Sequence, residues 1–228
     1  MAFITIRGLK RYFQMGDTTV KALDGIDLDV AEGEFLCLMG PSGSGKSTLL
    51  NLLGGLDTAD AGSVVVDGQE ITKLDENGLA IYRQQKVGFI FQTFNLISTM
   101  KAVQNVEFPM IFAGVPRDER RRRAIQLLEQ VGLSDRMDHK PTELSGGQQQ
   151  RVAVARGLSN QPAILLGDEP TGNLDSKTGK EILDMLTHLN QEGQTLIVVT
   201  HDPAVADYAE RTIHMLDGCI TDETNNHA

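Results

Sequence analysis

The sequence has no tryptophan and is poor in aromatic residues and cysteine. Its 228 residues include two Cys, and 5% are aromatic. Two cysteines cannot build the disulfide framework of a small secreted domain, and they fit a reducing compartment. No apolar run approaches the roughly 20 residues that a membrane-spanning helix needs. The start, from Met1 to Arg7, also lacks the layout of an export signal. We therefore expect a soluble chain that is long enough to bury its own core.

The chain also has fewer basic than acidic residues. The chain has 21 Lys and Arg against 31 Asp and Glu, which gives a formal net charge of −10. Because a nucleic-acid backbone attracts positive surfaces, this balance disfavours a general nucleic-acid binder. One basic cluster precedes a helical pattern: Arg117, Arg120, Arg121, Arg122 and Arg123. It is either a solvated helix face or a contact surface for anionic lipid headgroups or an acidic partner.

Apolar strand patterns alternate with helical patterns along the chain. Residues 3–35 predict short strands with a turn at Met15-Gly16-Asp17. Buried strands are expected over residues 35–39, 63–66, 87–91, 163–166 and 195–199. Helical patterns cover residues 47–53, 95–158 and 178–189. A hairpin turn is expected at Asp217-Gly218, with a polar, frayed tail after Thr221. The alternation predicts an α/β fold with a mostly parallel sheet.

A glycine-rich stretch follows the predicted strand at residues 35–39. Gly40-Pro41-Ser42-Gly43-Ser44-Gly45-Lys46-Ser47-Thr48 fits the pattern G-x-x-x-x-G-K-[ST] between a strand and a helix. Its glycines let backbone N–H groups close on phosphate oxygens, and the helix start adds partial positive charge. Lys46 can reach the outer phosphates, and the Ser47 hydroxyl can ligate Mg²⁺. This setting favours a nucleotide site over an ordinary glycine turn.

Four polar residues are expected at the ends of strands. Asp168 can hold the shell of a Mg²⁺ ion, and Glu169 can orient and deprotonate an attacking water. His201 can contact a terminal phosphate, because ligands of open α/β sheets bind at this end of the strands. Gln92 can bind the metal or the water. Each also has a plain structural explanation: solvated loop charges for the carboxylates, a helix cap for His201, and no role for Gln92.

A second glycine-rich helix start lies about a hundred residues further on, at Leu144-Ser145-Gly146-Gly147-Gln148. Ser145 is a good N-cap, and the bare N–H groups after it can bind a phosphate. A capped helix with a close-packed glycine pair explains the same residues without a ligand. We expect the two helix starts to close around the same nucleotide.

In this order, the motifs resemble those of the ATP-binding subunit of an ABC transporter. They are the Walker A loop 40–48, Gln92 of the Q-loop, the signature 144–148, the Walker B run 164–168 with Glu169, the D-loop 173–175 and His201 of the H-loop. The resemblance covers nearly the whole chain, and the signature is close to diagnostic. It implies a P-loop NTPase (RecA-like) α/β fold: a mostly parallel sheet core, an N-terminal antiparallel β subdomain and an inserted α-helical subdomain at about 95–158. All of it would form one domain, residues 1–228.

Three segments narrow the resemblance. Residues 89–96, 144–151 and 169–176 are similar to those of macrolide-export and lipoprotein-release ATPases. That subfamily works with permeases that have few membrane helices and large extracytoplasmic domains, and many members transmit force across the membrane. The implied partner is therefore an integral membrane permease. The implied location is the cytoplasmic face of the membrane, with no nucleic-acid partner. Since the chain stops soon after His201, the regulatory domain of some importers is expected to be absent.

The resemblance also implies roles, with ATP and Mg²⁺ as cofactors. Two copies would pack head to tail around two ATP molecules, with Asp175 at the seam. An aromatic residue near the N-terminus would stack on adenine, and Phe13 aligns better than Tyr12. The implied catalytic residues are Lys46, Gln92, Glu169 and His201, and the metal residues are Ser47, Gln92 and Asp168. The implied nucleotide-binding residues are Phe13, Gly40, Ser42, Gly43, Ser44, Gly45, Lys46, Ser47, Thr48, Ser145, Gly146, Gly147, Gln148 and Asp175.

Two other classes of protein share some of these motifs. An ABC-type ATPase of DNA repair or chromosome structure usually inserts a long coiled coil between the Walker A loop and the signature. The spacing from Lys46 to Ser145 leaves no room for one, and the acidic balance disfavours it. A P-loop kinase would pass phosphate to a small acceptor and would not need residues 144–148.

Overall fold

The fold is seen in a computed structural model that describes residues 2–226. The predicted span of 1–228 thus includes residues 1, 227 and 228, which lie outside the described part. The chain divides into two compact units. Unit 1 comprises residues 2–82 and 190–226, and unit 2 comprises residues 83–189. Two helices, α2 (Glu76–Lys86) and α6 (Ser176–Gln191), begin in one unit and end in the other.

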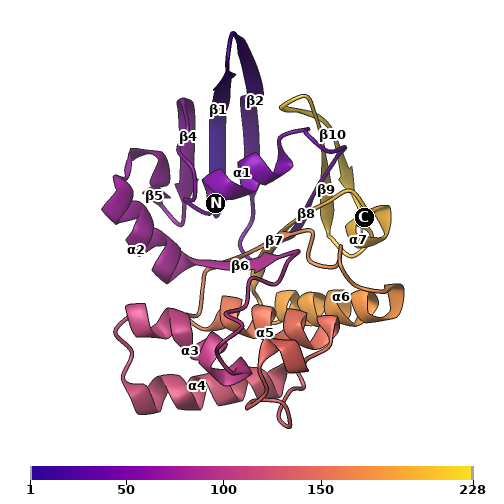
Figure 1. Cartoon of the computed structure of the whole chain (residues 1–228). Coiled ribbons are helices and arrows are strands. Elements are labelled where there is room, and N and C mark those ends of the chain that lie inside the picture. The colour runs from indigo at the N-terminus through magenta and orange to yellow at the C-terminus, as the bar shows by residue number, and fades with distance from the viewer. Residues whose placement is uncertain (1, 227–228) are drawn as a thin grey trace. The chain divides into compact units, whose positions relative to one another are not determined.

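Unit 1 contains an antiparallel sheet with the strand order β2-β1-β4-β5 (Figure 1). Its strands are β1 (Ile4–Met15), β2 (Thr18–Val30), β4 (Ala61–Val66) and β5 (Gln69–Glu70). The predicted antiparallel N-terminal sheet is confirmed. The expected short strands at residues 3–35 are wrong, because β1 and β2 form one long hairpin around the turn at Gly16. Bulges interrupt its pairing and blur the alternation of apolar and polar residues on which strand prediction depends.

Unit 1 also holds a parallel group of strands. Strand β3 (Phe35–Met39) pairs in parallel with β8 (Thr195–Thr200) and with β9 (Arg211–Leu216). All six residues of β8 are buried, as expected for a strand covered on both faces. β9 turns at Asp217-Gly218 into β10 (Cys219–Asn225). The expected hairpin is confirmed, but the expected fraying after Thr221 is wrong, since β10 stays paired to Asn225.

The helices of unit 1 are short. Helix α1 (Lys46–Leu53) follows the glycine-rich loop, η1 (Ile71–Lys73) follows β5, and α7 (Pro203–Ala206) follows β8. α1 ends at Gly54, as predicted, and Gly55 then takes the left-handed conformation. The Tyr82 hydroxyl donates a 2.7 Å hydrogen bond to the Leu53 carbonyl, which satisfies one of the last carbonyls of α1.

Unit 2 combines two parallel strands with a group of helices. β6 (Val87–Phe91) pairs with β7 (Ile164–Asp168). The helices α3 (Ala102–Phe112), α4 (Arg117–Gln130) and α5 (Gly146–Leu158) pack against one another, with η2 (Pro141–Glu143) just before α5 (Figure 1). All three helices fall within the predicted helical segment 95–158. Residues 95–101 are not helical, however, because a loop that follows Gln92 occupies them.

Candidate nucleotide-binding and catalytic sites

The predicted phosphate loop connects β3 to α1 within unit 1. Lys46, the first residue of α1, is buried, and its ammonium points back into the loop. It donates hydrogen bonds to the carbonyl oxygens of Gly40 at 2.7 Å and Pro41 at 2.9 Å. The Ser44 hydroxyl lies 3.4 Å from the same ammonium. A cation held inside a ring of backbone groups at a helix start is suited to bind a polyphosphate.

Two glycines of this loop cannot be replaced without moving their neighbours. A Cβ atom on Gly40 would overlap the carbonyl oxygen of Met215 in β9 and lie 2.8 Å from the Ser44 hydroxyl. Gly45 is left-handed at φ 100°, and a Cβ there would overlap the carbonyl oxygen of Ala22. Ala22 is skipped in the pairing of β1 with β2, so a bulge in β2 directs this carbonyl at the loop. Strands β2 and β9 therefore set the shape of the phosphate loop.

The turn between β9 and β10 also supports the phosphate loop. The Gly218 N–H donates a 3.1 Å hydrogen bond to the Ser44 carbonyl. The Gly218 carbonyl accepts a 2.9 Å hydrogen bond from the Asp24 N–H of β2. A Cβ on Gly218 would lie 2.9 Å from the Ala22 carbonyl oxygen. The turn thus joins residues near both ends of the chain to the loop.

Strand β1 places Phe13 and Tyr12 in different surroundings. The Tyr12 hydroxyl donates to the Asp24 carboxylate, and the Lys21 ammonium lies 5.7 Å from the centre of the Tyr12 ring. The hydrogen bond to Asp24 is the main cause of a raised Tyr12 pKa. Phe13 is 37% exposed, and only the Arg11 guanidinium lies over its ring among the aromatic contacts of the described chain, at 4.7 Å. Of the two, Phe13 is the wholly apolar ring, and the Arg11 guanidinium lies over it.

The predicted signature begins helix α5 in unit 2. Ser145 is its N-cap: its hydroxyl accepts a 3.3 Å hydrogen bond from the Gln148 N–H, and the Gln148 side chain accepts a 3.0 Å hydrogen bond from the Ser145 N–H. This reciprocal capping box was predicted only in part, through Ser145. The first-turn amides of Gly146 and Gly147 have no carbonyl partner within the helix. A Cβ on Gly147 would overlap the Thr178 side chain, which explains the glycine by packing.

Asp168 and Glu169 lie where the sequence places them, at the end of β7. Asp168 is the last residue of the strand, and Glu169 follows with a left-handed φ of 48°. A left-handed glutamate is uncommon, and such backbone strain is often found at functional sites. The Gly172 N–H donates to the Glu169 carbonyl at 3.0 Å and closes the turn.

Two other predicted residues of unit 2 border the same segment. Asp175 accepts hydrogen bonds from the Thr178 hydroxyl at 2.7 Å and its N–H at 3.0 Å, which lowers the pKa of Asp175. Gln92 follows β6, and the Asn173 side chain donates a 2.8 Å hydrogen bond to its carbonyl. The Gln92 amide lies 3.4 Å from the Asn173 side-chain oxygen. The predicted Q-loop and D-loop residues are thus in direct contact.

His201 follows β8 in unit 1 and is exposed. The next residue, Asp202, caps α7 by accepting a 2.9 Å hydrogen bond from the Ala204 N–H. The helix cap that the sequence allowed as an alternative for His201 is therefore Asp202.

Sequence analysis did not single out Arg156 and Asn105. The Arg156 guanidinium donates to the carbonyls of Phe94 and Asn95 in the loop that follows Gln92. Asn105 is 1% exposed and bonds the same loop at Ile97, whose N–H donates to its side-chain oxygen at 2.7 Å. The available signal was a polar residue on an otherwise apolar stretch: Arg156 follows Val152–Ala155, all buried. From sequence alone, such a residue cannot be assigned a partner.

Most of the basic cluster of α4 is engaged within unit 2. Arg121 pairs with Glu107 at 3.3 Å, Arg123 pairs with Glu119 at 2.8 Å, and Arg120 donates to the Val115 carbonyl at 3.3 Å. These contacts favour the interpretation as a solvated helix face.

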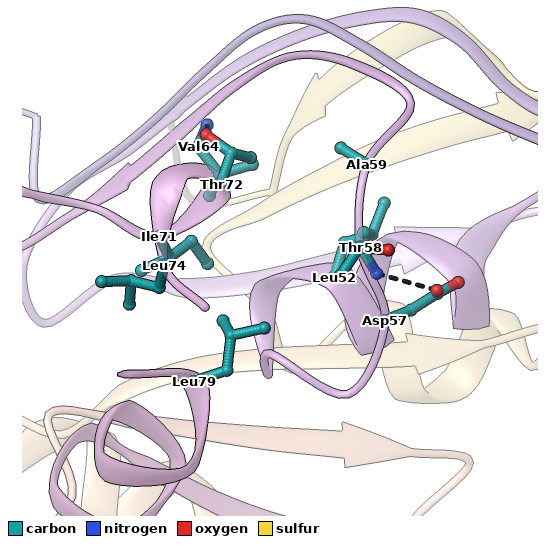
Figure 2. A pocket seen from close by; sticks show the side chains of 9 residues that line it. All are labelled: Leu52, Asp57, Thr58, Ala59, Val64, Ile71, Thr72, Leu74 and Leu79. Atoms are coloured by element: carbon teal, nitrogen blue, oxygen red, sulfur yellow. Dashed lines mark hydrogen bonds between the residues drawn. The ribbon is translucent and has the colours of Figure 1, made fainter. Parts of the chain in front are cut away.

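An apolar hollow in unit 1 lies apart from the predicted site residues. Figure 2 shows the nine residues that line it: Leu52, Asp57, Thr58, Ala59, Val64, Ile71, Thr72, Leu74 and Leu79. Its one charged group, Asp57, is paired with Arg11 at 2.7 Å and accepts from the Thr58 N–H at 2.8 Å. None of the predicted site residues is among these nine, and the hollow offers no further charge to a ligand.

Neither a protein metal cluster nor a membrane span is found between residues 2 and 226. No group of three or more His, Cys, Asp or Glu is arranged to hold a metal ion. The predicted metal residues Ser47, Gln92 and Asp168 offer only oxygen donors for this purpose, which suits Mg²⁺. Because Mg²⁺ binds through few protein ligands and keeps waters and phosphate oxygens, the missing cluster does not conflict with it. No helix in this range is long and apolar enough to cross a bilayer.

Comparisons with known proteins agree with this geometry. Residues 23–172 match the family model described as "ABC transporter". An ABC transporter ATP-binding protein of Thermotoga maritima is 50% identical over 92% of this chain and 90% of its own length. The macrolide export ATP-binding/permease protein MacB 1/2 of Paracoccus denitrificans is 51% identical over 95% of this chain. The match covers only 32% of that longer protein.

Two solved structures of the ATP-binding cassette MJ0796 also resemble this chain. One is described as a dimeric post-hydrolysis state bound to ADP and Pi, with a TM-score of 0.91 and 44% identity over 99% of both chains. The other is described as a dimeric structure of this bacterial ABC transporter cassette, with a TM-score of 0.91 and 46% identity. The predicted fold class is confirmed.

Proposed function

Since this chain belongs to the ABC transporter family as an ATP-binding, ATP-hydrolysing domain, we propose that it dimerises on ATP and drives a membrane permease. The partner permease would be of the export or force-transmitting type, and this chain would sit at the cytoplasmic face of the membrane. Support comes from the relatives named as macrolide export ATP-binding/permease proteins and from the dimeric cassettes. The alternatives, an ATPase acting on DNA and a P-loop kinase, gain no support from these relatives.

One observation carries this proposal: α5 begins with a capped, glycine-rich turn whose first amides have no acceptor within the helix. Ser145 and Gln148 satisfy each other, and the amides of Gly146 and Gly147 are left for an acceptor. A second copy can supply that acceptor as the terminal phosphate of its bound ATP. ADP lacks this phosphate, so ATP favours the closed dimer and hydrolysis favours its opening.

The chemistry follows from the residue types. Lys46 and the amides of the phosphate loop would bind the β- and γ-phosphates, and Phe13 would stack on adenine. Ser47, Gln92 and Asp168 would hold Mg²⁺, which neutralises charge on the phosphates when it is bound. Glu169 would orient and deprotonate the attacking water, and His201 would contact the terminal phosphate. Asp175 would lie at the seam of the dimer.

The decisive experiment separates ATP binding from hydrolysis. We expect Glu169→Gln to bind ATP like the wild type, to release phosphate about 100- to 10,000-fold more slowly, and to accumulate as a dimer in Mg-ATP. Glu129→Gln, an exposed change at the end of α4, is the matched control and should behave like the wild type. Phosphate release and light scattering measure both effects. A Glu169→Gln protein that hydrolyses ATP at the wild-type rate, or stays monomeric in saturating Mg-ATP, would refute the proposal.

A further inference from the structure

Arg156 lies near the end of α5 and has an unusual environment for an arginine. The side chain is half-buried, and desolvation lowers the pKa of Arg156. Across residues 2–226, no carboxylate forms an ion pair with it. Its side chain instead donates to two main-chain carbonyls, those of Phe94 at 2.9 Å and of Asn95. Partial burial of a charge is favourable only when its donors are satisfied, and these two carbonyls accept from the Arg156 guanidinium.

The loop that accepts these hydrogen bonds is strained. Phe94 and Asn95 are consecutive left-handed residues, with φ values of 58° and 50°. Asparagine tolerates this conformation, but a bulky phenylalanine is an outlier there. Two such residues in a row need support from outside the loop. Arg156 supplies it at the strained carbonyls, and Asn105 supplies it further along by bonding Ile97 and Met100.

The Phe94 ring also lies near the other end of α5. A Cβ on Gly146, in the first turn of the helix, would lie 3.7 Å from the tip of the Phe94 ring. Helical side chains point back toward the N-terminus, so Arg156 reaches along α5 toward that same turn. The main chain of Phe94 is thus bonded to Arg156 near one end of α5, and its ring lies near Gly146 at the other end.

This contact joins two of the proposed functional segments. The loop starts at Gln92, two residues before Phe94, and Gln92 is itself bonded to Asn173. If Arg156 no longer bonded the loop, Phe94 and Asn95 would leave their strained left-handed conformations. The Gln92 side chain would then no longer be held in one position.

We propose that Arg156 is a positioning residue that locks the loop after Gln92 onto the signature helix, so that the Gln92 amide and the Ser145–Gly147 edge move as one body during the ATP cycle. This inference rests on the proposed function. It adds a residue that touches neither nucleotide nor metal and acts through Gln92.

The proposal separates turnover from ATP affinity. The phosphate loop belongs to unit 1, and both carbonyls that accept from Arg156 lie in unit 2. Loss of Arg156 should therefore leave the affinity of the monomer for ATP unchanged and lower kcat. A misplacement of about 1 Å can cost about 100-fold in rate. We expect kcat to fall about 10- to 100-fold in Arg156→Met. It should fall less in Arg156→Lys, which keeps the charge but lacks the planar fork of donors that reaches both carbonyls.

The test compares these two variants with Arg123→Lys. Arg123 is a half-buried helical arginine of the same unit that also donates to a main-chain carbonyl, that of Ser159 at 3.3 Å. For each protein we would measure kcat, ATP affinity, the melting temperature and hydrogen exchange of the amides of residues 94–97. We expect kcat to fall in the order wild type, Arg156→Lys, Arg156→Met, while the affinity for ATP stays constant. Hydrogen exchange at residues 94–97 should become faster. The Arg123→Lys control should show neither effect.

Each contrary result has one meaning. A kcat per folded molecule within twofold of the wild type in Arg156→Lys and Arg156→Met, or unchanged exchange at residues 94–97, would overturn the role of Arg156. If Arg156→Met does not fold, Arg156→Lys decides: a lower melting temperature with wild-type kcat and exchange would leave only a structural contact. A wild-type protein without ATPase activity would refute the proposed function instead. Hydrogen exchange at residues 94–97 would still test whether Arg156 holds the loop.

Discussion

The ammonium of Lys46 donates a 2.7 Å hydrogen bond to the carbonyl of Gly40, six residues earlier in the chain. This bond fixes the charge inside the phosphate loop before any phosphate arrives. An ammonium has three donors, so binding a phosphate would exchange hydrogen bonds with the loop oxygens for hydrogen bonds with phosphate oxygens.

Lys46→Ala should weaken ATP binding and abolish measurable turnover. Hydrogen bonds to charged groups contribute about 1.5–3 kcal/mol, so the dissociation constant for ATP should rise about 10- to 150-fold. Fluorescent-nucleotide titration measures the affinity, and Lys180→Ala on α6 is a suitable control. Undiminished ATPase activity in Lys46→Ala would remove this residue from the site.

Gly218→Ala and Gly68→Ala form a matched pair. Both glycines follow a left-handed aspartate in a hairpin turn, with φ values of 78° and 75°. A Cβ on Gly68 meets nothing within 4 Å, whereas one on Gly218 would lie 2.7 Å from the Lys21 carbonyl oxygen. Both changes should lower the free energy of unfolding by about 1–2 kcal/mol, because alanine is disfavoured in the left-handed conformation. Gly218→Ala alone should cost more and should also weaken ATP binding, because its N–H supports Ser44.

Denaturant unfolding and nucleotide titration test this pair. Equal losses of stability in the two variants would show that the turn at Gly218 does not support the phosphate loop.

Phe13→Ala and Tyr12→Ala should separate the two candidates for adenine stacking. An aromatic pair contributes about 0.5–1.5 kcal/mol beyond its buried area, so Phe13→Ala should raise the KM for ATP by about two- to tenfold. Tyr12→Ala removes the other ring and should leave the KM nearly unchanged, and Tyr12→Phe, which loses only the hydroxyl bonded to Asp24, is its control. Steady-state kinetics decide: a KM raised by Tyr12→Ala but not by Phe13→Ala would assign the stacking role to Tyr12.

The Asp175 carboxylate should titrate below its ordinary pKa because Thr178 hydrogen-bonds its charged form. Since the folded state lowers this pKa, Asp175 stabilises the fold fully above its unfolded-state pKa of about 3.9. That contribution is lost as the pH falls through the lower folded-state value. Thr178→Val keeps the methyl packing at Gly147 but removes the hydroxyl donor, so it should raise the Asp175 pKa. NMR titration measures the shift, and an unchanged pKa would contradict this cause.

Local sequence patterns predicted the parts of the molecule that depend on local chemistry. The strand–loop–helix of Lys46 and the N-cap Ser145 need only residues that are neighbours in sequence, and both are found as expected. Patterns failed where distant contacts decide. The bulges that lengthen β1 and β2, and the pairing of β10 as far as Asn225, depend on strands elsewhere in the chain.

The candidate site shows the same division. The motifs identified its residue types, but the partner of Arg156 could not be deduced, because a carbonyl acceptor leaves no mark on the sequence. The same holds for the Ala22 and Met215 carbonyls that require glycine at positions 45 and 40. The surroundings of Phe13 and Tyr12 also needed the structure: the Tyr12 hydroxyl bonds Asp24, and the Arg11 guanidinium lies over the Phe13 ring.

The contact between Gly218 and Ser44 has a consequence for biosynthesis. The ribosome makes the phosphate loop about 170 residues before the backbone atoms that brace it, those of Met215 and Gly218. A nascent polypeptide that stops before residue 215 would carry the full nucleotide motif without its scaffold. Competence to capture ATP should thus arise only after residues 215–218 have been translated and have folded against the loop.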